Sequence, residues 1–550
     1  MTKLSATLLT SIALTLLSLD SLAQVLPEYD RGAGALSRQL QRLQTTASVL
    51  HTGAHPDDED SALIAYHARN DHARTAYLSL TRGSGGQNIV GPEQSDLLGV
   101  IRTEELLQAR TLDGADQYFT RAVDFGFSKQ RAEGARLWDE EAVLEDMVRV
   151  IRTFRPAVVV SRWTGTPTDG HGHHQFSGYL TPLAFAAAAN PARFPEQIEA
   201  GLEPWQPLKL YVGERSSEAL SDENVLGTDT GQVDPVAGRS YFQIGMRGRS
   251  QQKSQQMGSL ELHGTQTSLL RLVTSNVDST ADEQTIFAGI DTSLSAIADF
   301  EEQPTDELVA YLGELEQLVA VINASYRPLN PGGLVTPLSN GLAMTRAARQ
   351  SARSGDAQRL LDEKIAEFAD ALFTASGISI DALADRETVV PGDSLEVAIR
   401  IYHLENAAAS VSGATISIPD GWQATTADLN ELSNEQGFRR SEQPDAAEFF
   451  NVRVPAGESP SEPYWLEKPR QQFMYDWSGV DESGTEPFAP PLLSANVDLV
   501  IAGQPVSVSR EVRYRERDRV RGELRRPVDV VPAITLEPAT ELEIIAANSG

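Results

Sequence analysis

Residues 47–60 read ASVLHTGAHPDDED, and this stretch decides the fold of the chain. A short run of apolar and β-branched residues followed by glycine is typical of a buried strand that ends in a loop. Ligands of open α/β sheets gather at the carboxyl edge of such strands. We therefore expect the histidine and the four carboxylates after this strand to lie at the ligand-binding edge of a sheet.

The spacing within this stretch predicts a metal site. His55 and Asp58 are three residues apart, so a tight turn can direct an imidazole nitrogen and a carboxylate oxygen at one ion. That pair of donors suits zinc or a similar divalent metal. Asp57 lies between the two and cannot easily bind the same ion from the same side, which leaves it free to act as a base. Because the chain has no cysteine, any further ligand must be His, Asp or Glu.

A second group of histidines offers further ligands. Three of the nine histidines lie in residues 169–175, which read DGHGHHQ. If this run opens a helix, His171 and His174 share a face, while His173 points about 200° away from His171 at about 3.6 residues per turn. We therefore expect His171 and His174, rather than His173, to face the site.

Three motifs together resemble a known family. AHPDDE at residues 54–59, RTEELLQAR at residues 102–110 and HGHHQFSG at residues 171–178 resemble the motifs of the PIG-L/LmbE zinc-dependent N-deacetylases. The resemblance covers about residues 44–260. It implies an α/β fold with a Rossmann-like parallel sheet and a zinc cofactor, with Fe²⁺ as an alternative metal. It also implies an amidohydrolase that removes the N-acetyl group from an N-acetylglucosamine-type sugar or conjugate.

The resemblance also implies roles for five residues. The metal ligands of the family fall on His55, Asp58 and His174, its general base on Asp57, and its second catalytic histidine on His171. In such a mechanism zinc acidifies a water molecule and polarises the amide carbonyl, and Asp57 takes the proton. His171 then steadies the oxyanion or protonates the departing amine.

One position departs from the family pattern. The residue before the last ligand is often an Asp in this family and is His173 here. Asp169 is then the candidate for orienting His171, by its proximity in the sequence alone.

The helix expected over residues 94–112 has a charged pair on its apolar face. Arg102 and Glu105 lie in one stripe with Leu98, Ala109 and Leu112, which are spaced by three and four residues. Two interpretations stay open. The pair is either a buried structural ion pair, or Arg102 reaches the site and binds a substrate hydroxyl or carboxylate, as the matching arginine does in the PIG-L/LmbE family.

The length of 550 residues predicts more than one domain. Residues 1–23 are typical of a secretory signal peptide, which predicts a periplasmic or extracellular protein. We expect a deacetylase domain at residues 24–290, a helical segment at 291–375, a β-sandwich (Ig-like) module at 376–529, and at 530–550 either the start of a further β module or a strand that pairs elsewhere. Because the motifs end early, we expect residues 24–375 to fold and act on small substrates alone.

Composition narrows the classes of partner. A hydrophobic content of 41% indicates a globular chain, and a formal net charge of −31 disfavours nucleic acid and anionic membrane surfaces. No stretch after the signal is long and apolar enough to cross a membrane. The expected partner is an N-acetylated sugar or glycoconjugate, and the oligomeric state stays open.

Two other functions fit part of the pattern. Two histidines and one carboxylate can also hold ferrous iron in an oxygenase. The fold could instead belong to a non-catalytic glycan-binding surface protein. In such a protein a metal ligand or the general base would be missing. All four of the expected positions are intact, so hydrolysis is the favoured hypothesis.

Overall fold

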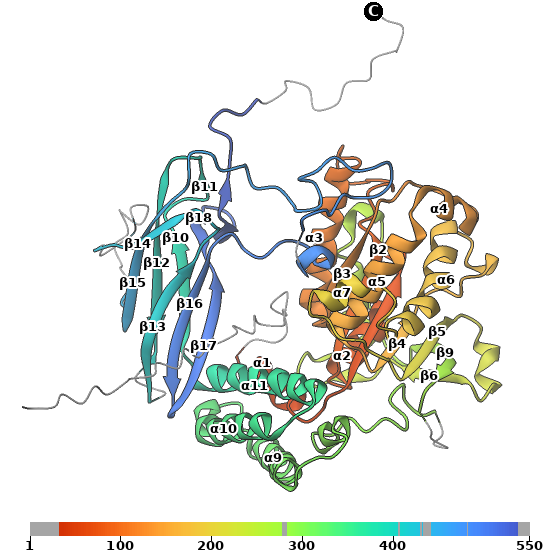
Figure 1. Ribbon diagram of the computed structural model, residues 1–550, viewed down its shortest axis with the longest axis horizontal. Helices are drawn as coiled ribbons and strands as arrows, with labels where there is room; N and C mark the ends of the chain where they lie inside the picture. The colour runs from red at the N-terminus through yellow and green to blue at the C-terminus, as the bar shows by residue number, and fades with distance from the viewer. Residues whose placement is uncertain are drawn as a thin grey trace, which may run out of the picture.

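A computed structural model describes residues 32–277, 283–404, 408–428, 432, 442–480 and 482–536. The expected signal peptide and residues 537–550 lie outside the described residues. Figure 1 shows an N-terminal α/β domain beside a C-terminal β-module, with a group of helices below and between them.

The α/β domain is built on a seven-stranded sheet with the order β3-β2-β1-β4-β5-β9-β6. Its first five strands in this order pair in parallel, which confirms the predicted Rossmann-like sheet. The last two pair antiparallel and were not predicted. The strands are β1 (Ser48–Gly53), β2 (Arg74–Thr81), β3 (Asp116–Ala122), β4 (Val158–Ser161), β5 (Lys209–Glu214), β6 (Val225–Asp229) and β9 (Thr267–Ser275).

Helices cover both faces of this sheet, because the side chains of its central strands alternate between two apolar layers. On one face Leu50 packs in a cluster with residues of α5 and α6, and on the other Val49 packs with Leu63 of α2. The helices of the domain are α1 (Ala33–Arg42), α2 (Ser61–Arg69), α3 (Asp96–Asp113), α4 (Arg131–Leu137), α5 (Glu140–Phe154), α6 (Gly172–Ala187), α7 (Pro195–Glu199) and α8 (Tyr241–Arg249). A two-stranded ribbon, β7 (Val233–Asp234) with β8 (Arg239–Ser240), precedes α8.

The predicted helical segment contains three long helices, α9 (Asp306–Ser325), α10 (Val335–Ser351) and α11 (Gly355–Ser376), which connect the two parts of the chain. Their apolar residues share one continuous core with α1 and with the strands of the β-module. None of the described helices has both the length and the apolar character that crossing a membrane requires.

The β-module consists of two facing sheets, as expected for a β-sandwich. Val397 and Val452 of one sheet and Val497 and Leu499 of the other lie in the same apolar cluster. The larger sheet contains β14 (Gln423–Thr426), β15 (Ala446–Arg453), β12 (Ser394–Tyr402), β10 (Ser379–Ala384), β18 (Arg513–Asp518) and β19 (Gly522–Pro527). The smaller contains β13 (Ala409–Ser417), β16 (Ser494–Ile501) and β17 (Gln504–Glu511). Of residues 530–550, Val530 belongs to β20 (Asp529–Val530), which pairs with β11 (Thr388–Val389) inside the module.

The chain between β15 and β16 does not stay on the β-module. It returns to the α/β domain beside α3, where it is drawn in blue in Figure 1. There Met474 forms an antiparallel bridge with Ala122, at the end of the edge strand β3. This contact and the shared core argue against residues 24–375 as a unit that folds alone.

Candidate active site

The site begins where β1 ends, at the edge that the sequence predicts. Gly53 closes the strand, and a Cβ there would lie 2.3 Å from the hydroxyl of Tyr77, so only glycine fits. The acidic residues that follow are not in the first turn of a helix. The helix α2 begins at Ser61, and Asp60 is its N-cap, accepting a hydrogen bond from the Leu63 N–H. Asp57 and Asp58 therefore lie in the loop before α2, outside the first helical turn, where the helix dipole would favour their ionised form.

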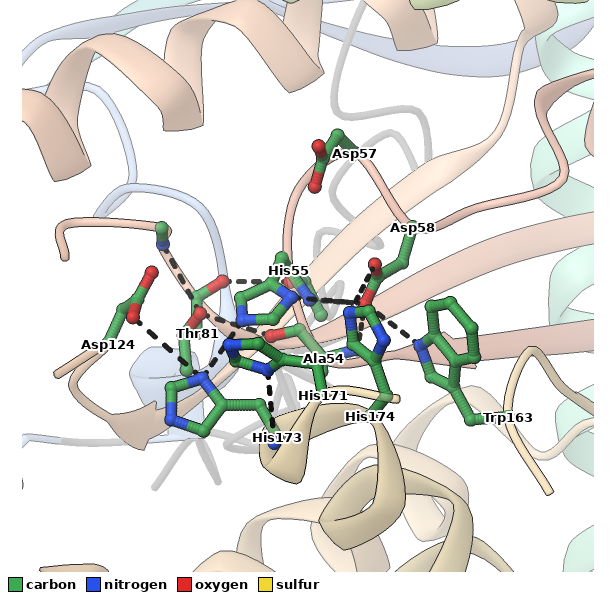
Figure 2. A network of polar contacts seen from close by, with 12 residues as sticks. Ala54, His55, Asp57, Asp58, Thr81, Asp124, Trp163, His171, His173 and His174 are labelled. Carbon is green, nitrogen blue, oxygen red and sulfur yellow. Dashed lines mark hydrogen bonds and ion pairs between the residues drawn. The ribbon is translucent and has the colours of Figure 1, made fainter. Parts of the chain in front are cut away.

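Backbone and indole donors, rather than a helix dipole, hold Asp58. Its Oδ2 accepts hydrogen bonds from the N–H groups of Ala54 and His55, both at 2.8 Å, and from Nε1 of Trp163 at 2.9 Å. Burial opposes ionisation, but His55 and His174 hold the pKa of Asp58 well below its ordinary value. Asp58 is therefore an anion whose second oxygen, Oδ1, remains directed at the site (Figure 2).

His174 presents one ring nitrogen to this carboxylate. Its Nδ1 lies 3.2 Å from the carbonyl oxygen of Asp169, which can only accept, so Nδ1 carries the proton. Its ring stacks on Trp163 with 3.7 Å between centroids. Nε2 then has a lone pair 3.2 Å from Oδ1 of Asp58. A lone pair and a carboxylate oxygen repel at this distance unless a proton or a cation lies between them.

His55 completes this side of the site. Its Nδ1 lies 3.4 Å from Oδ2 of Asp58, and its Nε2 is hydrogen-bonded to Nδ1 of His173 at 2.9 Å. Burial would lower its pKa, but Asp58 outweighs burial and raises the pKa of His55 to about 9. The neighbouring carboxylate thus favours positive charge at this position.

The histidine run is arranged differently from our expectation. His171 is the N-cap of α6, with its Nδ1 accepting the N–H of His173, and the helix begins only at Gly172. Helical spacing therefore does not relate His171 to His173, and the prediction that His173 points away is wrong. All three rings lie around His55, with centroids 5.1 to 5.2 Å from its own (Figure 2). The helix continues through Pro182.

The ligand atoms gather closely enough to hold a metal ion. One atom each from His55, His171 and His174 lies within 4.8 Å of the others, as do atoms from His55, Asp57 and Asp58. A third such group is formed by His55, Asp124 and His173. Imidazole nitrogens beside a buried carboxylate are the donors that zinc and similar ions take, and an ion bound here would replace the proton that Asp58 favours on His55. The residues present therefore fit a divalent cation.

Asp57 lies beside this group with its carboxylate free. Among the described residues no hydrogen bond reaches the Asp57 carboxylate, while its backbone oxygen accepts from Arg249 at 2.9 Å. Burial and the neighbouring Asp58 raise the pKa of Asp57. A carboxylate with a raised pKa and no partner is suited to accept a proton.

Arg102 supports the loop after β2. Its guanidinium donates to the carbonyl oxygens of Gly83 and Gln87. It does not pair directly with Glu105, because Ser254 lies between them and donates both its N–H and its hydroxyl to the Glu105 carboxylate. The interpretation as a direct ion pair is wrong, while substrate binding by Arg102 stays a prediction.

Asp169 does not orient His171 through its carboxylate. That group accepts the N–H groups of Thr164, Gly165 and Thr166 and so closes the loop before α6. Its contribution to the site is the backbone carbonyl that fixes His174.

Sequence reasoning did not assign three residues that touch the site: Asp124, Trp163 and His173. Asp124 Oδ1 lies 3.8 Å from Nδ1 of His173. Trp163 holds Asp58 and stacks on His174. The available signal was that Asp124 and Trp163 follow the apolar runs of β3 and β4, whose ends meet at the same edge as β1.

Comparison with known proteins shows what this α/β domain is similar to. Residues 50–185 match the family model "PIG-L: GlcNAc-PI de-N-acetylase". A 1D-myo-inositol 2-acetamido-2-deoxy-alpha-D-glucopyranoside deacetylase from Kineococcus radiotolerans is 29% identical over 202 residues, which are 31% of this chain and 53% of that protein. The chain thus spans about half the length of this relative.

Two solved structures are also similar in part. One is the N,N'-diacetylchitobiose deacetylase from Pyrococcus horikoshii, at 16% identity over 38% of this chain and 70% of that chain, with a TM-score of 0.27. The other is GalB, the 4-carboxy-2-hydroxymuconate hydratase from Pseudomonas putida, at 18% identity over 43% of this chain and 99% of that chain, with a TM-score of 0.30.

Proposed function

We propose that this protein is a metal-dependent N-deacetylase that hydrolyses the N-acetyl group of an N-acetylglucosamine-type sugar or conjugate. One observation carries the proposal: a ring nitrogen of His55 and one of His174 lie 3.4 and 3.2 Å from the two carboxylate oxygens of Asp58, beside Asp57, a half-buried carboxylate without a hydrogen bond from the described residues. The PIG-L match over residues 50–185 and the deacetylase relative support the substrate class.

The metal would be held by His55, Asp58 and His174. Zn²⁺ is the first candidate and Fe²⁺ the second, because the donors are two imidazoles and one carboxylate. Such an ion supplies a Lewis acid that lowers the pKa of water and polarises the amide carbonyl. The carbonyl of Asp169 and the indole of Trp163 keep His174 and Asp58 oriented for this purpose.

Two side chains would move protons. Asp57 accepts the proton of the attacking water, since its carboxylate is close to the ligand group and has no competing donor among the described residues. Burial, together with His55 and His174, lowers the pKa of His171 to about 4. His171 is therefore a neutral imidazole at pH 7, with its Nε2 3.3 Å from the Ser128 N–H. It would take over the proton that Asp57 accepts from the water and, as an imidazolium, would steady the oxyanion or pass that proton to the leaving amine.

Substrate contact and export complete the proposal. Arg102, whose guanidinium already binds the loop after β2, is assigned to the sugar's polar groups.

Residues 1–23 direct export to the periplasm or beyond. Fractionation of cells that produce the full chain tests export, and protein confined to the cytoplasm would contradict it.

The experiment for the reaction uses the purified full chain. We expect about one zinc per chain by elemental analysis and release of free amine from a panel of N-acetyl sugars. Removal of the metal by a chelator should abolish activity, and added Zn²⁺ should restore it. Full activity of metal-free protein would refute the mechanism. Metal binding without turnover on any N-acetyl sugar would favour a glycan-binding role instead.

A further inference from the structure

The segment of the β-module between β15 and β16 reaches the loops that carry the site. We propose that residues 463–488, hereafter the insert, are a positioning element of the active site, acting through Phe125 on His173 and through Arg82 on the loop after β2. The proposal rests on the proposed metal site. It adds to the structure that supports this site a segment far outside the PIG-L match at residues 50–185.

The insert extends the catalytic sheet at its edge. Val123 N–H donates to the Phe473 carbonyl at 2.9 Å, and Tyr475 N–H donates to the Arg121 carbonyl at 2.8 Å. These bonds flank the bridge between Ala122 and Met474. Because β3 is the outermost strand of the sheet, the insert occupies backbone groups that would otherwise be an open edge. Residues 121–123, which the insert holds through these contacts, come immediately before Asp124 and Phe125.

Arg82 is the second anchor. Its side chain is fully buried, and its guanidinium donates to the carbonyl oxygens of Glu486 and Pro487 and to the Tyr464 hydroxyl. The guanidinium also lies 3.3 Å from the ring centroid of Trp465. A buried guanidinium is stable only when its donors are satisfied, and the insert supplies three of its acceptors.

Arg82 is adjacent to a residue that holds the metal loop. Both the N–H and the hydroxyl of Thr81 donate to the carbonyl oxygen of Ala54, at 3.1 and 3.0 Å. Ala54 directly precedes His55. A displacement of Arg82 would therefore be passed through Thr81 to the loop that carries His55.

Packed aromatic rings connect the insert to the site by a shorter path than the one through Arg82. The Phe473 ring lies 5.5 Å from that of Phe125, and the Phe125 ring lies 4.2 Å from that of His173. Trp138 packs on His173 from 4.4 Å. His173 in turn hydrogen-bonds the ring nitrogen of His55 that faces away from Asp58. Partners of this kind set the orientation of a metal-ligating imidazole, and their loss typically costs about 10- to 100-fold in metal affinity.

The test compares, in the full chain, a phenylalanine of the insert with one outside it. Phe473→Ala removes the ring that packs on Phe125. Phe373→Ala is the matched control, because Phe373 is also half-buried but lies in α11, where it packs on the apolar core shared with the β-module and lies 5.2 Å from the guanidinium of Arg510. Phe473→Leu restores most of the apolar volume. For each protein we would measure the dissociation constant of Zn²⁺ by competition with a chelator, the melting temperature, and kcat and KM.

We expect both alanine variants to lower the melting temperature, and only Phe473→Ala to weaken zinc binding, by roughly 10-fold, with Phe473→Leu close to wild type. A purely structural role would make the two alanine variants alike, and equal zinc affinities, whether unchanged or equally reduced, would overturn the proposal. If the wild type binds zinc but deacetylates nothing, the proposed function fails while the zinc comparison still decides this inference. A wild type that binds no zinc would overturn both.

Discussion

The change of Asp58 to asparagine tests the metal site most directly, because the surrounding hydrogen bonds set the size of its effect. Oδ2 accepts three N–H groups at 2.8 to 2.9 Å. Hydrogen bonds to a charged acceptor contribute about 1 kcal/mol more than those to a neutral one. Three such bonds give about 3 kcal/mol of lost stability for Asp58→Asn in the metal-free protein, even if the amide oxygen keeps all three donors.

The same change should also weaken zinc binding, because a neutral amide replaces the anion 3.2 Å from Nε2 of His174. The assay is a urea titration of metal-free protein together with elemental analysis of the metal-loaded protein. Asp57→Asn is the matched control, since no hydrogen bond from the described residues reaches that carboxylate, and its stability should be no lower than that of wild type, because burial and Asp58 already disfavour the ionised carboxylate. An Asp58→Asn protein with wild-type stability and zinc content would refute the reasoning.

Two further predictions concern the neighbouring carboxylates. Asp57→Asn should lower turnover by roughly 10² to 10⁴ with unchanged zinc content, as expected for a positioned base; an active variant would remove Asp57 from the mechanism. Glu59 is buried, and burial, partly offset by Arg110, raises its pKa from 4.5 to about 7. Glu59 therefore ionises at a lower pH in the unfolded chain than in the folded protein. The free energy of unfolding of the metal-free wild type should fall as the pH rises from about 4.5 to about 7. Over this range the stability of Glu59→Gln relative to wild type should increase by about 3 kcal/mol. A stability difference between variant and wild type that is the same at both pH values would contradict this assignment.

Local patterns were sufficient for the parallel sheet and for the place of the site. The apolar run before Gly53 and the β-branched run at residues 158–161 are β1 and β4, which are neighbours in the sheet. Their adjacent ends bring His55 close to the histidine run. The antiparallel strands β9 and β6 were missed, because their half-exposed residues lack the continuous apolar pattern of a central strand.

The details of the site depended on where two helices begin, which the sequence pattern leaves uncertain by a residue or more. With α2 starting at Ser61, the acidic residues lie in a loop, and Asp58 is held by Trp163 and backbone N–H groups instead of a helix terminus. With α6 starting at Gly172, His171 is a cap, and His173 turns toward His55. Successive residues of a helix point about 100° apart, but a residue that lies before the helix start, as His171 does, is not bound by that spacing.

The separability of the β-module could not be judged from the sequence, because the contacts that decide it join residues hundreds of positions apart. Arg82 follows the strand β2 and resembles an ordinary loop arginine, yet its side chain is fully buried under Tyr464, Trp465 and residues 486–487. Cutting the chain after residue 375 would expose that cluster and remove three acceptors from Arg82. It would also remove the β-strands that share a core with α11. The module is therefore better regarded as part of the structure that supports the site than as an attachment domain joined to a complete enzyme.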